Sequence, residues 1–234
     1  MDFPALAAGL ARVREVVAER QHRAGLNHAV RIVAVTKTHG PGAVRAAWDA
    51  GLRDVGENRV QEALPKQDAT TDLPLAWHLI GGLQRNKARQ AAGRFALIHS
   101  VDRVELAQEL DRRAAGGGPQ PVLIQVNCSD ESQKGGVGPE HLEHLLDAVR
   151  SLAHLELRGL MTMAAYDADE AAQRRTFARL RSLRDASVQQ GAALPELSMG
   201  MSGDYPAAVA EGATLLRLGT VLFGEREAGP ERHT

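Results

Sequence analysis

The sequence has few aromatic residues and only one cysteine. Phe, Trp and Tyr make up 3% of its 234 residues, so the hydrophobic core must be aliphatic. A single cysteine, Cys128, cannot form an intramolecular disulfide, which excludes a disulfide-stapled scaffold and suits a reducing compartment. Cys128 follows an expected strand, where a small buried hydrophobe is its default role and a reactive thiol is the alternative.

The sequence also lacks strong net charge and long apolar runs. The net charge of −1 offers no general attraction to nucleic acid or to an anionic membrane. No apolar run approaches the ~20 residues that cross a bilayer. Residues 3–24 alternate Leu and Val with charges of both signs, as in an amphipathic helix rather than a leader peptide. We therefore expect a cytoplasmic protein with neither nucleic acid nor membrane as a partner.

Apolar runs alternate with helical patterns along the whole chain. The expected strands are 32–36, 54–56, 75–80, 96–100, 121–126, 155–160, 194–198 and 214–218. The expected helices are 3–24, 41–50, 60–67, 84–93, 103–115 with Asp102 as its cap, 139–152, 169–190 and 204–212. Eight strands and eight helices in this length favour one closed (β/α)₈ barrel domain over residues 1–234. A dinucleotide-binding sheet is disfavoured because no G-x-G-x-x-G follows the first strand.

Polar residues gather where the expected strands end. In a barrel of this kind the carboxyl ends of the strands carry the functional site. The residues at these ends are Lys37, Glu57, Asn58, His78, Asn127, Lys134, Met161, Thr162, Ser198 to Ser202, Arg217, Gly219 and Thr220.

The last two strand ends predict a phosphate site. Barrels of this class bind phosphate between the loops after strands seven and eight, at the start of a short extra helix. Here residues 198–203 run into the expected short helix at Asp204, and Gly219 and Thr220 add open backbone and a hydroxyl. The alternative is that the glycines of these loops only make turns.

Two cations at the expected mouth have both a functional and a structural interpretation. Lys37 closes an apolar strand. Desolvation there would lower the pKa of the amine and favour a nucleophile able to form a Schiff base. The alternative is that the Lys37 side chain simply points into solvent. Arg217 lies in an apolar strand and must find a partner if buried. That partner is either a ligand acceptor or an internal carboxylate, Glu57 or Glu196.

A lysine able to form a Schiff base, a phosphate cup and a fixed arginine together describe a site for pyridoxal 5′-phosphate (PLP). Seven motifs carry a family resemblance: residues 33–37 (VAVTK), 55–62 (VGENRVQE), 77–87 (WHLIGGLQRNK), 98–102 (IHSVD), 158–162 (RGLMT), 197–202 (LSMGMS) and 217–224 (RLGTVLFG). With these motifs the chain resembles the PLP homeostasis proteins, single-domain relatives of the alanine racemase barrel. The resemblance covers about residues 31–226.

The resemblance implies a role for several residues. PLP would be held as a Schiff base on Lys37, with its phosphate on Ser202, Gly219 and Thr220 and its ring nitrogen facing Arg217. The other residues expected near PLP are Asn58, His78, Met161 and Ser198. The chain departs from the family at Val55, Arg59, Gly82, Arg85 and the pair His39-Gly40, near the second and third strands.

The resemblance also implies intracellular carriage and buffering of PLP, a form of vitamin B6, without clear turnover. PLP-requiring apo-enzymes are the expected recipients, and a monomer is expected. The rival interpretation is an amino-acid racemase, which needs a second acid/base opposite Lys37. Alanine racemases take a tyrosine from an added β-domain, and only 14 residues follow Thr220 here. Tyr166 and Tyr205 lie on expected mouth loops, so weak activity stays open.

A possible metal motif is weak. His141 and His144 stand three residues apart on an expected outer helix, but no third ligand has useful spacing. We therefore expect no metal site.

Overall fold

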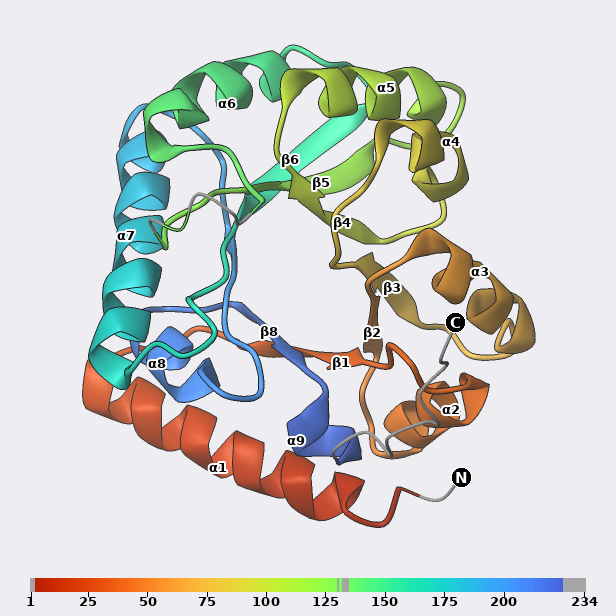
Figure 1. Ribbon diagram of the computed structural model, residues 1–234, viewed down its shortest axis with the longest axis vertical. Coiled ribbons are helices and arrows are strands. Elements are labelled where there is room, and N and C mark those ends of the chain that lie inside the picture. The colour runs from red at the N-terminus through yellow and green to blue at the C-terminus, as the bar shows by residue number, and fades with distance from the viewer. Residues whose placement is uncertain (1–2, 130, 132–134, 225–234) are drawn as a thin grey trace, which may run out of the picture.

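The computed structural model describes residues 3–129, 131 and 135–224, and eight parallel strands in this part close into a barrel (Figure 1). Each strand pairs with its neighbour in sequence, and β8 pairs with β1 to close the ring. The strands are β1 (Arg31–Val35), β2 (Asp54–Glu57), β3 (Ala76–Leu79), β4 (Leu97–Val101), β5 (Gln120–Gln125), β6 (Leu155–Met161), β7 (Glu196–Ser198) and β8 (Leu215–Leu218). The predicted barrel is confirmed.

Helices surround the barrel, and one of them was not predicted. They are α1 (Leu6–Ala24), α2 (Pro41–Asp49), α3 (Val60–Ala69), η1 (Arg85–Lys87), α4 (Ala88–Ala91), α5 (Val104–Ala114), η2 (Pro139–His141), α6 (Leu142–Arg150), α7 (Glu170–Gln189), α8 (Tyr205–Ala210) and α9 (Thr220–Phe223). Helix α1 runs beside α8 and α9 (Figure 1). The additional helix, α9, follows β8 directly.

Three local predictions were wrong in detail. The expected cap Asp102 makes no cap hydrogen bond: α5 begins after Arg103, whose guanidinium instead binds the Asp102 carboxylate at 2.5 Å. The expected helix 84–93 is a 3₁₀ turn followed by a short α-helix. Strand β7 begins only at Glu196. All three differences concern the bounds or the type of an element, and the closed-barrel topology is as predicted.

The residues of each strand alternate between an aliphatic shell and the barrel interior. One large buried cluster fills the space between the strands and the helices, while a second, small apolar cluster lies apart from it. The second cluster consists of Val33, Leu97, Leu123, Met161 and Leu215. Since side chains alternate along a strand, Arg217 is on the same side of β8 as Leu215. The rest of the interior is therefore available to polar side chains.

Helix α1 holds α9 through a glycine contact. A Cβ atom on Gly9 would lie 2.4 Å from the Val221 carbonyl oxygen, so only glycine permits this approach. Phe3 and Phe223 stack edge to face with ring centroids 5.2 Å apart, and His39 contacts both rings. The start of the chain therefore joins the loop after β1 to α9. Among the described residues, the helices are each too short or too polar to span a membrane.

Candidate binding site at the mouth of the barrel

The loops after β7 and β8 meet at the Ser202 hydroxyl. Its oxygen accepts hydrogen bonds from the backbone N–H groups of Gly219 and Val221, each at 3.2 Å. Thr220 lies between these two residues and is exposed. Two N–H groups and a hydroxyl that converge on one point are the donor set that phosphate oxygens require. We call the Ser202 hydroxyl with the N–H groups of Gly219 and Val221 the donor cup, so Gly219 is part of this cup as well as of a turn.

Both loops expected to share the phosphate site are represented here. We expected the anion at the start of the helix after Asp204, which is α8, with Gly219 and Thr220 supplying a second open backbone and a hydroxyl. Just before α8, the Asp204 carboxylate accepts the Met201 N–H at 2.5 Å and makes no capping hydrogen bond to the helix. The N–H groups that face Ser202 come from the beginning of α9. Gly200 in the same loop does make a turn, with φ of 93°.

Arg217 is buried inside the barrel without a direct carboxylate contact among the described residues. Its side chain donates to Ser198 Oγ at 2.6 Å and to the Thr162 carbonyl oxygen at 2.9 Å. Burial lowers the pKa of Arg217 to about 10, so the group remains charged at neutral pH. The expected internal partners were wrong because Glu57 binds Lys66 and Glu196 binds Arg31.

Lys37 lies in a tight turn just after β1. Lys37 comes two residues after Val35. Gly219 packs against Val35, since a Cβ atom added to Gly219 would lie 3.6 Å from the Val35 Cβ. Lys37 is half-buried. The next residue, Thr38, has a φ of 70°, which is uncommon for a β-branched residue. The lysine therefore stands beside the donor cup, on a turn whose backbone is strained.

A buried ion pair fixes the start of this turn. Lys66 Nζ donates to Glu57 Oε1 at 2.6 Å and to the Thr36 carbonyl oxygen at 2.9 Å. The Thr36 hydroxyl also donates to Glu57 Oε1, while Glu57 Oε2 is buried and has no hydrogen-bond partner among the described residues. The Thr36 carbonyl additionally accepts the His39 N–H. Glu57 therefore anchors the turn before Lys37 from outside the barrel and does not point into the mouth.

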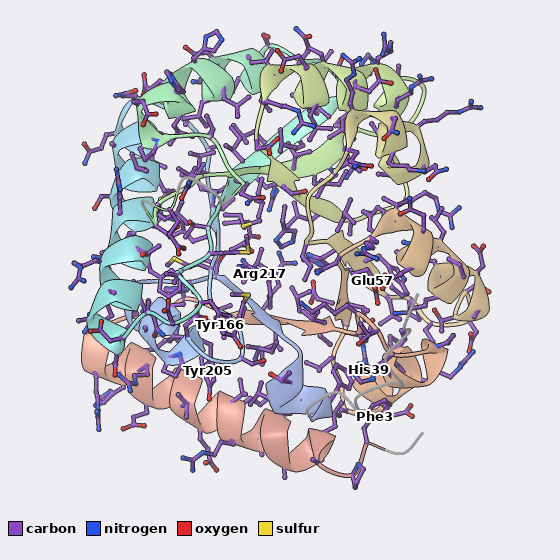
Figure 2. All side chains as sticks on the ribbon, viewed as in Figure 1. Phe3, His39, Glu57, Tyr166, Tyr205 and Arg217 are labelled. Atoms are coloured by element: carbon purple, nitrogen blue, oxygen red, sulfur yellow. The ribbon has the colours of Figure 1, made fainter. Side chains whose placement is uncertain are left out.

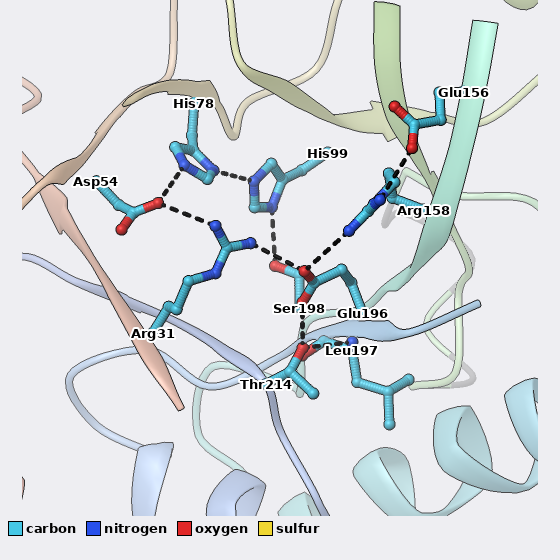
Figure 3. Close-up of polar contacts among 10 residues, drawn as sticks. All are labelled: Arg31, Asp54, His78, His99, Glu156, Arg158, Glu196, Leu197, Ser198 and Thr214. Carbon is cyan, nitrogen blue, oxygen red and sulfur yellow. Dashed lines mark hydrogen bonds and ion pairs between the residues drawn. The ribbon is translucent and has the colours of Figure 1, made fainter. Parts of the chain in front are cut away.

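A line of hydrogen-bonded side chains runs from Ser198, the partner of Arg217, through His99 and His78 to Asp54 (Figure 3). Ser198 Oγ lies 2.8 Å from His99 Nδ1, and His99 Nε2 lies 2.9 Å from His78 Nδ1. His78 Nε2 then lies 2.9 Å from Asp54 Oδ1. Of these residues, His78 and Ser198 were expected at the cofactor, and the structure places both in this buried line.

The remaining sequence-predicted residues take up different places. Asn58 is half-buried and lines a cleft of about 620 Å³ beside the mouth, together with Arg59, Gly82 and Lys87. Met161 is fully buried in the interior apolar cluster. Asn127 donates to the Glu131 carbonyl within its own loop. Lys134 lies outside the described residues.

Neither mouth tyrosine is held in the barrel interior. Tyr166 is fully exposed, whereas Tyr205 is the first residue of α8 and is 7% exposed (Figure 2). Burial raises the pKa of the Tyr205 phenol. Cys128 is buried within the main aliphatic cluster. In the part of the chain that the structure describes, no three His, Cys, Asp or Glu side chains are grouped to hold a metal ion.

Several residues that shape the site were missed from the sequence. Lys66, His99 and Gly9 had been given no role, although each carried a signal. His99 stands in one of the quoted motifs, Lys66 is a charge on the buried face of α3, and Gly9 interrupts an otherwise regular amphipathic helix. None of these signals names its partner: Glu57 lies nine residues from Lys66, and Gly9 meets Val221 at the far end of the chain.

The buried His99 predicts an acid-sensitive fold. Its pKa is well below 6.5, because burial and the nearby His78, Arg217 and Arg31 all disfavour a charged ring. Below about pH 6.5 the unfolded chain therefore binds a proton that the folded chain does not, and the free energy of unfolding falls as pH falls. Urea unfolding between pH 7.5 and 5 should show this loss, with a contribution from His99 of up to about 1.4 kcal/mol per pH unit.

Two variants separate this contribution from general acid effects. His99→Gln should flatten the slope of stability against pH, while His144→Gln, on the exposed face of α6, should leave it as in the wild type. Equal slopes for all three proteins would contradict the assignment.

Comparison with known proteins places the chain in a family. Residues 9–227 match the family model described as "Alanine racemase, N-terminal domain". The chain is 48% identical over 226 residues to the "Pyridoxal phosphate homeostasis protein" of Pseudomonas aeruginosa, covering 96% of this chain and 97% of that protein. The chain belongs to the pyridoxal phosphate homeostasis protein family. The resemblance inferred from the seven motifs is thereby confirmed.

Solved structures agree with this assignment. PipY of Synechococcus elongatus PCC7942 is 44% identical and has been solved without PLP (TM-score 0.83, 94% of this chain and 100% of that chain) and with PLP bound (TM-score 0.78, 89% and 100%). Alanine racemase of Bacillus anthracis is 17% identical with a TM-score of 0.71, which shows a shared fold alone. The match covers 99% of this chain but 58% of the racemase chain.

Proposed function

We propose that this protein binds PLP at the barrel mouth and takes part in PLP homeostasis as a carrier and buffer. The observation that carries the proposal is the convergence of the Gly219 and Val221 N–H groups on Ser202, close to the turn that bears Lys37. The PLP-bound structure of a 44% identical relative supports it. We assign the phosphate to Ser202, Gly219 and Thr220, and the covalent Schiff base to Lys37.

The residues present fit such a ligand. PLP supplies an aldehyde that a lysine amine can capture and a pyridine ring that can act as an electron sink. Lys37 provides the amine, on the turn held by Lys66 and Glu57. Arg217 provides a charged donor in the interior, and a guanidinium has no lone pair to offer as an acceptor. A ring nitrogen facing Arg217 would stay unprotonated, which weakens the electron sink. We assign further cofactor contacts to Asn58, Met161 and Ser198, and an indirect contribution to His78, whose two ring nitrogens bond His99 and Asp54 in the buried line.

We propose that the protein has no enzymatic turnover of its own. Racemisation needs a proton-transfer group on each face of the substrate. Tyr205 is buried in α8, and Tyr166 is fully exposed. The relatives are named as homeostasis proteins. Incubating the PLP-loaded protein with L-amino acids should leave the products without D-isomer by chiral chromatography, whereas turnover at enzyme-like rates would favour the racemase interpretation.

Carriage is tested by transfer to another protein. We propose that PLP-requiring apo-enzymes are the recipients and that the protein acts as a monomer. PLP-loaded protein, desalted and mixed with an apo-aminotransferase, should restore its activity while losing its own visible absorption. Failure to restore activity over hours, with the PLP still bound, would contradict a carrier role, and the elution volume on size exclusion tests the monomer.

The phosphate assignment predicts that Ser202→Ala loses affinity for PLP but not for pyridoxal. Removing the hydroxyl deletes a hydrogen bond to an ionised group, worth about 1.5–3 kcal/mol. PLP affinity should therefore fall about ten- to hundredfold, while affinity for pyridoxal, which has no phosphate, should stay unchanged. Titrations of both ligands measure this, with Ser151→Ala, an exposed serine at the end of α6, as the control. Equal losses for both ligands would place the phosphate elsewhere.

A further inference from the structure

The two ends of the buried line of side chains determine the direction of every hydrogen bond in it. At one end, the Asp54 carboxylate lies next to the Arg31 guanidinium at 3.4 Å and can only accept. At the other end, Arg217 can only donate. Three groups that can both donate and accept lie between them: His78, His99 and Ser198.

From the acidic end, each proton position follows in turn. His78 Nε2 must carry a proton to meet the carboxylate, and as a neutral imidazole His78 then has a bare Nδ1 that accepts from His99 Nε2. His99 is neutral because its pKa is lowered by burial, so its Nδ1 is bare too. It therefore accepts the Ser198 hydroxyl proton, and the Ser198 oxygen keeps its lone pairs for Arg217. The direction is Arg217 to Ser198 to His99 to His78 to Asp54.

The opposite arrangement would disturb Arg217. If His99 carried its proton on Nδ1, that N–H would donate to Ser198, and the Ser198 hydroxyl proton would find no other acceptor in the hydrogen-bond network of the described residues. The hydroxyl proton of Ser198 would then face the guanidinium of Arg217, so that two hydrogen-bond donors would point at each other. The tautomer of His99 thus decides whether Ser198 accepts from Arg217.

The strand order explains why this connection is indirect. Val33 on β1 pairs with Asp54 on β2 on one side and with Arg217 on β8 on the other. The two charged residues therefore stand two strand spacings apart, about 10 Å, with the fully buried Val33 between them. The hydrogen-bonded route goes across the interior instead, through β3, β4 and β7.

We infer that Asp54, at the base of the barrel, is a positioning residue for Arg217 and acts through His78, His99 and Ser198. Asp54 is half-buried and lines a pocket of about 320 Å³ at the amino-terminal ends of β1 and β2. Asp54 determines the tautomers of His78 and His99. These tautomers determine the direction in which the Ser198 hydroxyl donates its proton, and the hydroxyl oxygen orients the Arg217 guanidinium. Asp204 favours the charge on Arg217 separately, through direct electrostatic attraction. The effect of Asp54 on PLP rests on the function proposed above; its effect on the tautomers does not.

The first test uses the protein without PLP. In ¹⁵N NMR of histidine-labelled wild type, both His78 and His99 should show a protonated Nε2 and a bare Nδ1. In Asp54→Asn the amide can donate to His78, so the tautomer preference of both rings should weaken or reverse. Glu196→Gln is the matched control, since Glu196 also binds Arg31 and is similarly buried but lies outside the line. Wild-type tautomers in Asp54→Asn would overturn the inference.

The second test measures the coupling to PLP. Asp54→Asn should weaken PLP binding about three- to tenfold and move the absorption maximum of the loaded protein, while Glu196→Gln should do neither. In a Ser198→Ala background, which cuts the line, Asp54→Asn should have no further effect on either quantity. Equal effects with and without Ser198 would overturn the inference. If the wild type itself fails to bind PLP, the proposed function is wrong. The NMR measurement of the histidine tautomers then still tests whether Asp54 controls the direction of the hydrogen bonds. If Asp54→Asn does not fold, Ser198→Ala decides instead: His99 should keep its protonated Nε2, because that proton is set from the Asp54 side, and a reversed tautomer would overturn the inference.

Discussion

Replacing Lys37 with alanine is expected to abolish the covalent retention of PLP. Wild-type protein mixed with PLP and passed through a desalting column should keep a visible absorption band, because the amine on the turn after β1 captures the aldehyde. Lys37→Ala should emerge colourless. Phosphate contacts alone would still permit reversible binding, so equilibrium titration should show weakened PLP affinity rather than none.

A neighbouring lysine supplies the control for this experiment. Lys87→Ala removes an amine from the cleft beside the mouth without touching the turn or the donor cup. It should retain the band of the wild type. A band that survives in Lys37→Ala and disappears in Lys87→Ala would move the covalent site into the cleft.

Removal of Lys66 is expected to destabilise the fold more than any surface ion-pair variant. Lys66→Met leaves the fully buried Glu57 carboxylate without its cation, and one of its oxygens already lacks a partner. Breaking a buried pair in this way costs about 3–5 kcal/mol, which corresponds to a Tm loss of roughly 6–20 °C for a chain of this size. Thermal and urea unfolding measure both quantities.

Two further variants show whether the unpaired charge is the cause. Glu57→Leu combined with Lys66→Met removes both charges and should recover much of the lost stability. Arg45→Met breaks the exposed pair with Asp72 and should cost less than about 1 kcal/mol. A double variant as unstable as the single one would show that packing, and not the orphaned carboxylate, determines the loss.

Strand-end position was sufficient to predict that the loops after β7 and β8 meet. Lys37, Ser202 and Gly219 each follow an apolar run, and in a parallel barrel such positions converge at one end. The hydrophobic periodicity alone could assign these residues to strand ends, because periodicity depends only on residues that are close in the sequence. The Ser202 to Gly219 contact, which joins two loops, agrees with that prediction. The role proposed for these residues rests on their residue type together with this shared position.

The parts that could not be predicted depend on pairings between distant residues. Helix α9 consists of Thr-Val-Leu-Phe, whose β-branched and aromatic residues resemble a continuation of β8. It is helical where α1 packs on it through Gly9. The partner of Arg217 was sought among carboxylates, because a buried cation usually meets one. The barrel supplies a hydroxyl and a carbonyl oxygen instead.

The most direct test of the central claim locates the bound cofactor chemically. PLP-loaded wild-type protein is reduced with borohydride, digested and analysed by peptide mass spectrometry. We predict a phosphopyridoxyl group on Lys37 at about one equivalent per chain, with the other lysines unmodified. A stoichiometric label on Lys66, Lys87 or another lysine, with Lys37 unmodified, would contradict it.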